Sequence, residues 1–137
     1  MIQTDIKTDY KPLSGREKWL AAQIVDISIC VHKAFGPGLL ENIYEKCFCY
    51  ELAKRGIAFE RQKIIQLQYD KLIIDEGLRI DILVDQLVVV ELKAQEYCHP
   101  VWKAQVLSYL KLSNKRLGYI LNFNVPIMKE DISRMII

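Results

Sequence analysis

Residues 79–93 have the sequence RIDILVDQLVVVELK, which predicts two strands of a central sheet. Two apolar runs flank a short polar break, and both are rich in the β-branched residues that favour strands. Because side chains alternate along a strand, Arg79 and Asp81 share one face of the first strand. By the same rule, Glu91 and Lys93 share one face of the second. The strand pair therefore places two carboxylates and a lysine within the predicted core of the fold.

These charges require a compensating partner, because burying an unpaired carboxylate costs several kcal/mol. A bound metal ion would neutralise Asp81 and Glu91 together. The competing interpretation is a salt bridge between these carboxylates and Lys93 on the exposed face of a hairpin. The spacing of the three residues alone leaves both interpretations open.

Composition limits the fold class and the function classes. The chain of 137 residues is expected to form a single domain, 1–137, and its hydrophobic fraction of 51% and charged fraction of 26% are typical of a folded soluble protein. A net charge of +2 neither indicates nor excludes a nucleic-acid-binding groove. No run approaches the roughly 18 apolar residues of a membrane span, and the N-terminus does not resemble a signal peptide. We therefore expect a cytoplasmic protein with no membrane partner.

The cysteines and histidines give no metal-binding pattern. The four cysteines have neither zinc-ribbon nor CxxC spacing, so we expect small buried side chains in a reducing compartment at Cys30, Cys47, Cys49 and Cys98. His32 and His99 are isolated and are assigned no catalytic role.

Periodicity predicts helices before and after the strand pair. Residues 1–13 are expected to form an N-terminal arm, and Ser14 with Glu17 fits a capping box at the start of the first helix. The predicted helices are 14–35, about 39–54 and about 100–113, with a short helix within 129–137. The predicted strands are 57–60, 64–69, 72–74, 78–84, 87–93 and 117–123, with turns at 70–71 and 75–77. A strand–helix–strand crossover would make 117–123 parallel to its neighbour in the sheet.

Glu41 lies in the first turn of the second predicted helix. Its spacing to Tyr44 and Phe48 places it on the same helix face, so we expect it to point toward the core. The helix dipole also favours a carboxylate in the first turn, which is a competing structural reason for its presence.

Asp81 with Glu91-Leu92-Lys93 resembles the PD-(D/E)xK nuclease signature of the restriction-endonuclease-like fold. The stretch Gly38–Tyr44, GLLENIY, matches the pattern that names the GxxExxY protein family, a small branch of that superfamily. Ile80 stands where the name of the motif has proline, which is commonly absent in the superfamily. The resemblance covers about Arg16 to Met135 and implies an α/β (α+β) fold with a mixed central sheet flanked by helices.

The resemblance implies a metal-dependent phosphodiesterase, a nuclease that acts on DNA in preference to RNA. Asp81 and Glu91 would hold Mg²⁺ or Mn²⁺, and the backbone carbonyl of Leu92 is the usual third protein ligand in similar enzymes. Glu41 could reach the same ion directly or through water. Lys93 would orient the attacking water or stabilise charge in the transition state.

Three further residues are implied as substrate-positioning groups. In similar enzymes the residues at Gln105 and Tyr109 help to hold the lysine and the nucleic-acid backbone. Ordinary helix surface and core packing is the alternative for both. Arg79 could contact phosphate, or it could pair with Asp81 or Glu91.

A second interpretation is a catalytically inactive nucleic-acid-binding or interaction module that retains the nuclease fold. The chain is close to a minimal nuclease core, without an obvious target-recognition domain. A symmetric homodimer is a hypothesis, because cleavage of a duplex requires two cuts.

Overall fold

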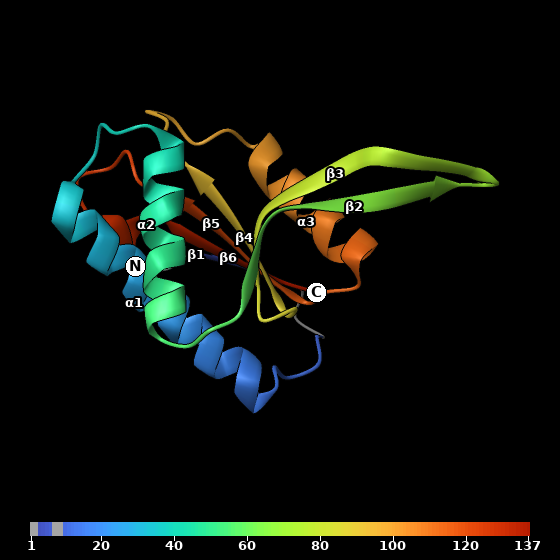
Figure 1. The fold of residues 1–137 in the computed structure, drawn as a ribbon, viewed down its shortest axis with the longest axis horizontal. Helices are drawn as coiled ribbons and strands as arrows, with labels where there is room; N and C mark the ends of the chain where they lie inside the picture. The colour runs from blue at the N-terminus through green and yellow to red at the C-terminus, as the bar shows by residue number, and fades with distance from the viewer. Residues whose placement is uncertain (1–2, 7–9) are drawn as a thin grey trace.

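A six-stranded mixed sheet with helices on both faces forms the fold in the computed structural model (Figure 1). The structure describes residues 3–6, by their backbone only, and residues 10–137. The elements in chain order are β1 (Gln3–Ile6), α1 (Gly15–Phe35), α2 (Glu41–Lys54), β2 (Phe59–Tyr69), β3 (Leu72–Val84), β4 (Val88–Lys93), α3 (Val101–Ser113), β5 (Leu117–Asn122), the 3₁₀ turn η1 (Met128–Glu130) and β6 (Ile132–Ile136). The predicted α+β class, with a mixed sheet flanked by helices, is confirmed.

The strand order is β1-β6-β5-β4-β3-β2, so the quoted stretch forms strands inside the sheet. β3 is antiparallel to both β2 and β4, as expected for hairpin-linked strands. β5 is parallel to β4, with Glu91 beside Ile120 and Lys93 beside Asn122. The predicted crossover through α3 is therefore confirmed, because a helix is needed to connect parallel neighbours.

Two apolar layers enclose the sheet. On one face α1 and α2 bury side chains such as Leu20, Ile24 and Phe48 against alternate residues of β4 and β5. On the other face α3 buries Trp102, Val106 and Leu110 against a smaller cluster that includes Val89 and Ile120. The buried strands are apolar on both faces, which explains the uninterrupted hydrophobic runs in their sequences.

The first helix begins and ends as predicted. The Ser14 hydroxyl accepts a hydrogen bond from the Glu17 backbone N–H at 3.1 Å, and the Glu17 carboxylate accepts one from the Ser14 N–H at 2.8 Å. This reciprocal pair is the predicted capping box. At the other end Gly36 has a φ of 65°, a left-handed conformation that ends the helix after Phe35.

The predicted turn at 75–77 is wrong. β3 is continuous from Leu72 to Val84, and β2 and β3 form one long hairpin whose only turn is at residues 70–71. The register shifts between Ile65 and Leu67, so the segment 75–77 forms an irregularity in the ladder instead of reversing the chain. Gly77 suits this position because a Cβ there would collide with the Leu67 side chain.

The predicted C-terminal helix is also wrong. Met128–Glu130 is a single 3₁₀ turn, and Ile132–Ile136 is a strand antiparallel to β5. Pairing with β5 outweighs the local helical pattern of this segment, since the segment covers an otherwise open edge of β5. Part of the predicted N-terminal arm, β1, pairs in parallel with β6. The rest of that predicted arm up to residue 9 lies outside the described residues.

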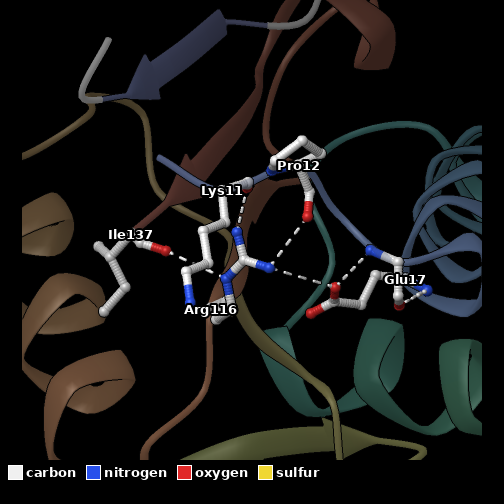
Figure 2. Close-up of polar contacts among 6 residues, drawn as sticks. Lys11, Pro12, Glu17, Arg116 and Ile137 are labelled. Carbon is white, nitrogen blue, oxygen red and sulfur yellow. Dashed lines mark hydrogen bonds and ion pairs between the residues drawn. The ribbon is translucent and has the colours of Figure 1, made fainter. Parts of the chain in front are cut away.

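Arg116 joins the segment before α1 to the residue after β6 (Figure 2). Its guanidinium donates to the carbonyl oxygens of Lys11, Pro12 and Ile137, the last two at 3.1 and 3.4 Å. Glu17 lies 3.9 Å from the same guanidinium. One side chain thus connects the start of α1 with the end of β6.

Several predicted buried positions are exposed. The spacing of apolar residues along 39–54 predicts a buried stripe that includes Leu40 and Ile43, but both lie at the surface, while Tyr44, Phe48 and Leu52 are buried. Cys49 is buried as expected, whereas Cys30 and Cys98 are exposed and Cys47 is half-buried. All four thiols are free. Within the part of the chain that the structure describes, no helix has the length and apolarity needed to cross a membrane.

Candidate active site

Asp81 and Glu91 meet where β3 separates from β4. The Asp81 backbone N–H donates to Glu91 Oε1 at 3.0 Å, and the Leu92 N–H donates to Asp81 Oδ2 at 3.0 Å. Each carboxylate therefore accepts from the backbone of the opposite strand. These two hydrogen bonds fix the positions of both side chains.

The hydrogen bonds between these two side chains and the backbone take the place of strand pairing. The β3–β4 ladder runs from Val84–Val88 through Leu83–Val89 to Ile82–Val90 and ends there. Asp81 and Glu91 would form the next pair in that register. Because their carboxylates satisfy the backbone donors at this step, the strands can diverge without leaving buried N–H groups unpaired.

Burial and mutual repulsion favour a proton on this pair. Loss of solvation is the largest cause that raises the pKa of Glu91, which is 6% exposed, and the charge of Asp81 raises it further. Loss of solvation also raises the pKa of Asp81, against the opposing effect of the hydrogen bond from Leu92. A proton on one of the two carboxyl groups would relieve this repulsion. A cation at this position would relieve the same repulsion.

Lys93 lies beside this pair and over an aromatic ring. It is two residues after Glu91 on the same strand face, as predicted. Its Nζ is 5.4 Å from the centroid of the Trp102 ring on α3. The positive charge of Lys93 lowers the pKa of both Asp81 and Glu91, which shows that it lies within electrostatic range of each carboxylate. Trp102, which packs in the apolar cluster under α3, thus also contacts Lys93.

Glu41 approaches the same pair from the first turn of α2. The residue is exposed, so the prediction that it points into the core is wrong. Its carboxyl group is nevertheless partly desolvated, which raises its pKa, and the charge of Asp81 raises it further while Lys93 opposes. Glu41 is therefore electrostatically coupled to Asp81.

Tyr44 and the glycines before α2 hold Glu41 in place. The buried Tyr44 hydroxyl donates to the Gly36 carbonyl at 2.6 Å and accepts from the Leu39 N–H at 3.1 Å. Its ring stacks on Phe123 with 4.6 Å between centroids. Gly38 has a φ of 104°, which only glycine adopts readily. The glycine and tyrosine of this stretch thus have structural roles that fix the start of the helix.

Glu45 is a nearby carboxylate that the sequence analysis did not identify. It is buried, accepts from Arg61 at 2.6 Å and from Gln62 at 2.7 Å, and contributes to the raised pKa of both Asp81 and Glu41. Its position four residues after Glu41, on the same helix face, was the available signal. Because Arg61 and Gln62 already donate to the Glu45 carboxylate, this residue joins α2 to the start of β2 and is not an open ligand.

The three predicted substrate-positioning residues differ in their placement. Tyr109 is half-buried on α3, and its pKa is raised by desolvation and then by the charges of Glu91 and Asp81. Arg79 is exposed, and its positive charge partly offsets the raised pKa of Tyr109, so it also lies near Tyr109. Gln105 is exposed on α3, and no hydrogen bond among the described residues joins it to the site. Within the same residues, Arg79 forms no ion pair with Asp81 or Glu91.

The oxygen donors suit a hard divalent cation. Across residues 3–6 and 10–137, no group of three or more His, Cys, Asp and Glu side chains converges closely enough to hold a metal ion. Two carboxylates are held next to each other by the backbone of the opposite strands, however, and Mg²⁺ is commonly bound through one or two carboxylates with several waters. The adjacent Asp81 and Glu91 fit that requirement, and their excess negative charge favours a cation.

The family comparison agrees with this geometry. A family model described as the PD-(D/E)XK nuclease superfamily matches residues 18–135, which include every candidate site residue. No curated protein and no solved structure matches the chain.

Proposed function

The chain belongs to the PD-(D/E)XK nuclease superfamily, and we propose that it is a metal-dependent phosphodiesterase that cleaves DNA in preference to RNA. The observation that carries the proposal is the contact between Asp81 and Glu91 beside Lys93, at the point where two core strands diverge. We assign the chain to the GxxExxY branch on the stretch Gly38–Tyr44.

Asp81 and Glu91 would hold Mg²⁺ or Mn²⁺, with the backbone carbonyl of Leu92 and the carboxylate of Glu41 as further ligands. A bound divalent ion supplies Lewis acidity and lowers the pKa of a coordinated water. The contact between the carboxylates supports their role, and the electrostatic coupling of Glu41 to Asp81 supports a ligand or water-mediated position.

Lys93 would orient the attacking water or stabilise negative charge that develops on the phosphate oxygens. Trp102 restricts the ammonium group on one side, so the charge is held near the carboxylates. Tyr109 and Arg79 lie on the same side of the site and would contact the sugar–phosphate backbone. Gln105, exposed on the same helix, would contribute there only after substrate binds.

The test is a cleavage assay with purified protein, Mg²⁺ or Mn²⁺, and linear, circular and single-stranded DNA together with RNA. Asp81→Asn and Lys93→Ala should each abolish cleavage, and excess chelator should do the same. Asp85→Asn is a matched control, because Asp85 lies at the opposite end of the same two strands, where it pairs with Arg16 at 2.7 Å. That variant should cleave like the native chain.

Cleavage that survives both site substitutions would come from a contaminating nuclease or another site and would contradict the proposal. Binding to nucleic acid without cleavage, unaffected by chelator, would favour the inactive binding module. Faster cleavage of RNA than of DNA would correct the substrate assignment while leaving the site intact.

A further inference from the structure

The outer half of the β2–β3 hairpin projects from the body of the protein as a two-stranded ribbon (Figure 1). We define this ribbon as residues 63–79. β3 pairs with β4 only over Ile82–Val84, so beyond Asp81 the hairpin continues without β4. Two-stranded hairpins are at best marginally stable in water, which indicates that such a ribbon requires additional contacts.

The ribbon exposes large apolar side chains on both faces. Ile64 is 59% exposed and Ile73 is 47% exposed. Both lie on one face of the ribbon, because Gln68 is four residues after Ile64 on β2 and pairs with Ile73 on β3. Tyr69 and Leu72 form a cross-strand pair on the other face and are 76% and 59% exposed. Apolar residues gathered in this way mark interaction sites more often than ordinary surface.

The charge of the ribbon favours a protein partner over nucleic acid. Its three basic residues are balanced by three acidic ones, and these are Lys63, Lys71, Arg79, Asp70, Asp75 and Glu76. A surface that binds the phosphate backbone carries a clear excess of lysine and arginine. The ribbon is neutral and apolar instead.

β2 is also the last strand of the sheet on this side. Among the described residues, no strand pairs with its outer edge. An exposed, apolar edge strand is a ready template for pairing with another strand. The ribbon therefore offers backbone hydrogen bonds as well as apolar contacts.

The β2 sequence is complementary to itself when two copies run antiparallel about Gln66. In that register Ile65 lies opposite Leu67 of a second copy, so apolar residues meet. Lys63 lies opposite Tyr69, where an ammonium group can pack on an aromatic ring. On the other face Ile64 lies opposite Gln68. No like charges meet anywhere between positions 63 and 69.

We propose that this protein forms a symmetric homodimer in which the outer edges of two β2 strands pair antiparallel about Gln66. The two sheets then form one continuous sheet, and the outer edge of each β2 strand is covered by the other copy. Around a twofold axis, residue i of one copy contacts residue j of the other, and residue j of the first contacts residue i of the second. The patch must therefore be complementary to itself. The dimer does not depend on nuclease activity, so an inactive chain would form it equally.

Light scattering across a dilution series tests the proposal. The native chain should show a mass near twice 16.0 kDa at the higher concentrations. Tyr69→Lys places the new lysine opposite Lys63 of the other copy, at both symmetric positions. The dissociation constant of the dimer should then rise by about tenfold or more. Adding Lys63→Glu to that variant should restore the dimer, because opposite charges then meet across the interface.

Leu112→Lys is the matched control, since Leu112 is a 53% exposed apolar residue of α3 and is not part of the ribbon or of the proposed strand pairing. It should leave the mass unchanged. A monomeric native chain at its highest soluble concentration would overturn the proposal, even if footprinting then placed DNA on the ribbon. A native dimer that is insensitive to Tyr69→Lys, or a variant that Lys63→Glu does not rescue, would overturn the assigned register.

Discussion

Asp81 and Glu91 occupy the step at which the β3–β4 ladder stops, and each accepts a hydrogen bond from the other strand's backbone. The pair thus has two roles. It satisfies the backbone where two strands diverge, and it brings two carboxylates into contact. Holding two negative charges next to each other lowers the free energy of unfolding when no cation is bound.

Replacing Glu91 with the isosteric Gln should stabilise the metal-free protein at neutral and alkaline pH. Desolvation and the charge of Asp81 raise the pKa of Glu91 above its unfolded-state value, so the folded state binds more protons between those two values. The native stability must therefore fall as pH rises through that window. Glu91→Gln removes the titrating group, and the free energy of unfolding should increase by roughly 1–3 kcal/mol.

Urea unfolding of both chains with chelator present, at about pH 5 and about pH 8, measures this effect. The difference between the two chains should be larger at the higher pH. Asp85→Asn serves as the control, because Asp85 is ion-paired with Arg16 and does not contact another carboxylate at this site. A difference that shrinks as pH rises would contradict the assigned direction of the pKa shift.

Mn²⁺ or Mg²⁺ should raise the unfolding temperature of the native chain. A ligand that binds only the folded state stabilises it, by about 2.7 kcal/mol at a concentration one hundred times its dissociation constant. Asp81→Asn and Glu91→Gln should both lose most of this response, and chelator should reverse it. Differential scanning calorimetry provides the measurement, and an equal response in all three chains would place the ion elsewhere.

Trp102→Leu should lower kcat more than it raises KM. The Lys93 ammonium lies 5.4 Å from the Trp102 ring centroid, and losing this contact frees the charge from its position beside the carboxylates. A cation–π contact of this kind predicts a roughly tenfold loss in rate. Trp102→Phe keeps an aromatic face and should recover much of kcat. If both variants lose activity only in proportion to their folded fraction, Trp102 has a packing role alone.

Gly118→Ala should destabilise the fold by roughly 1–3 kcal/mol. A Cβ at Gly118 would lie 2.7 Å from a methyl carbon of Val106, so α3 would have to move away from β5. Gly15→Ala is the matched control, because nothing lies within 4 Å of a Cβ there and the position is in the first turn of α1. Thermal unfolding should show a loss for the first variant and a neutral or slightly stabilising effect for the second.

Local sequence patterns were sufficient to predict several helices and strands. The capping box of Ser14 and Glu17 fixed the start of α1, and the β-branched runs on either side of Asp85 predicted β3 and β4. Segments whose structure depends on a distant partner were assigned wrongly. Residues 75–77 have the composition of a turn, but the pairs on either side of them, Ile65–Leu78 and Leu67–Ile74, keep the chain extended. Residues 132–136 become a strand because β5 offers an open edge.

The sequence by itself determined that Asp81, Glu91 and Lys93 lie on neighbouring strands, because alternation and spacing along each strand set those positions. Only the tertiary structure decided how they interact. The divergence of β3 from β4 brings the two carboxylates into contact, and packing of α3 places Trp102 beside Lys93. Alternation along a strand is a local property of the backbone. Contact between side chains depends on where separate elements pack, and burial, charge and pairing across the whole chain set that arrangement.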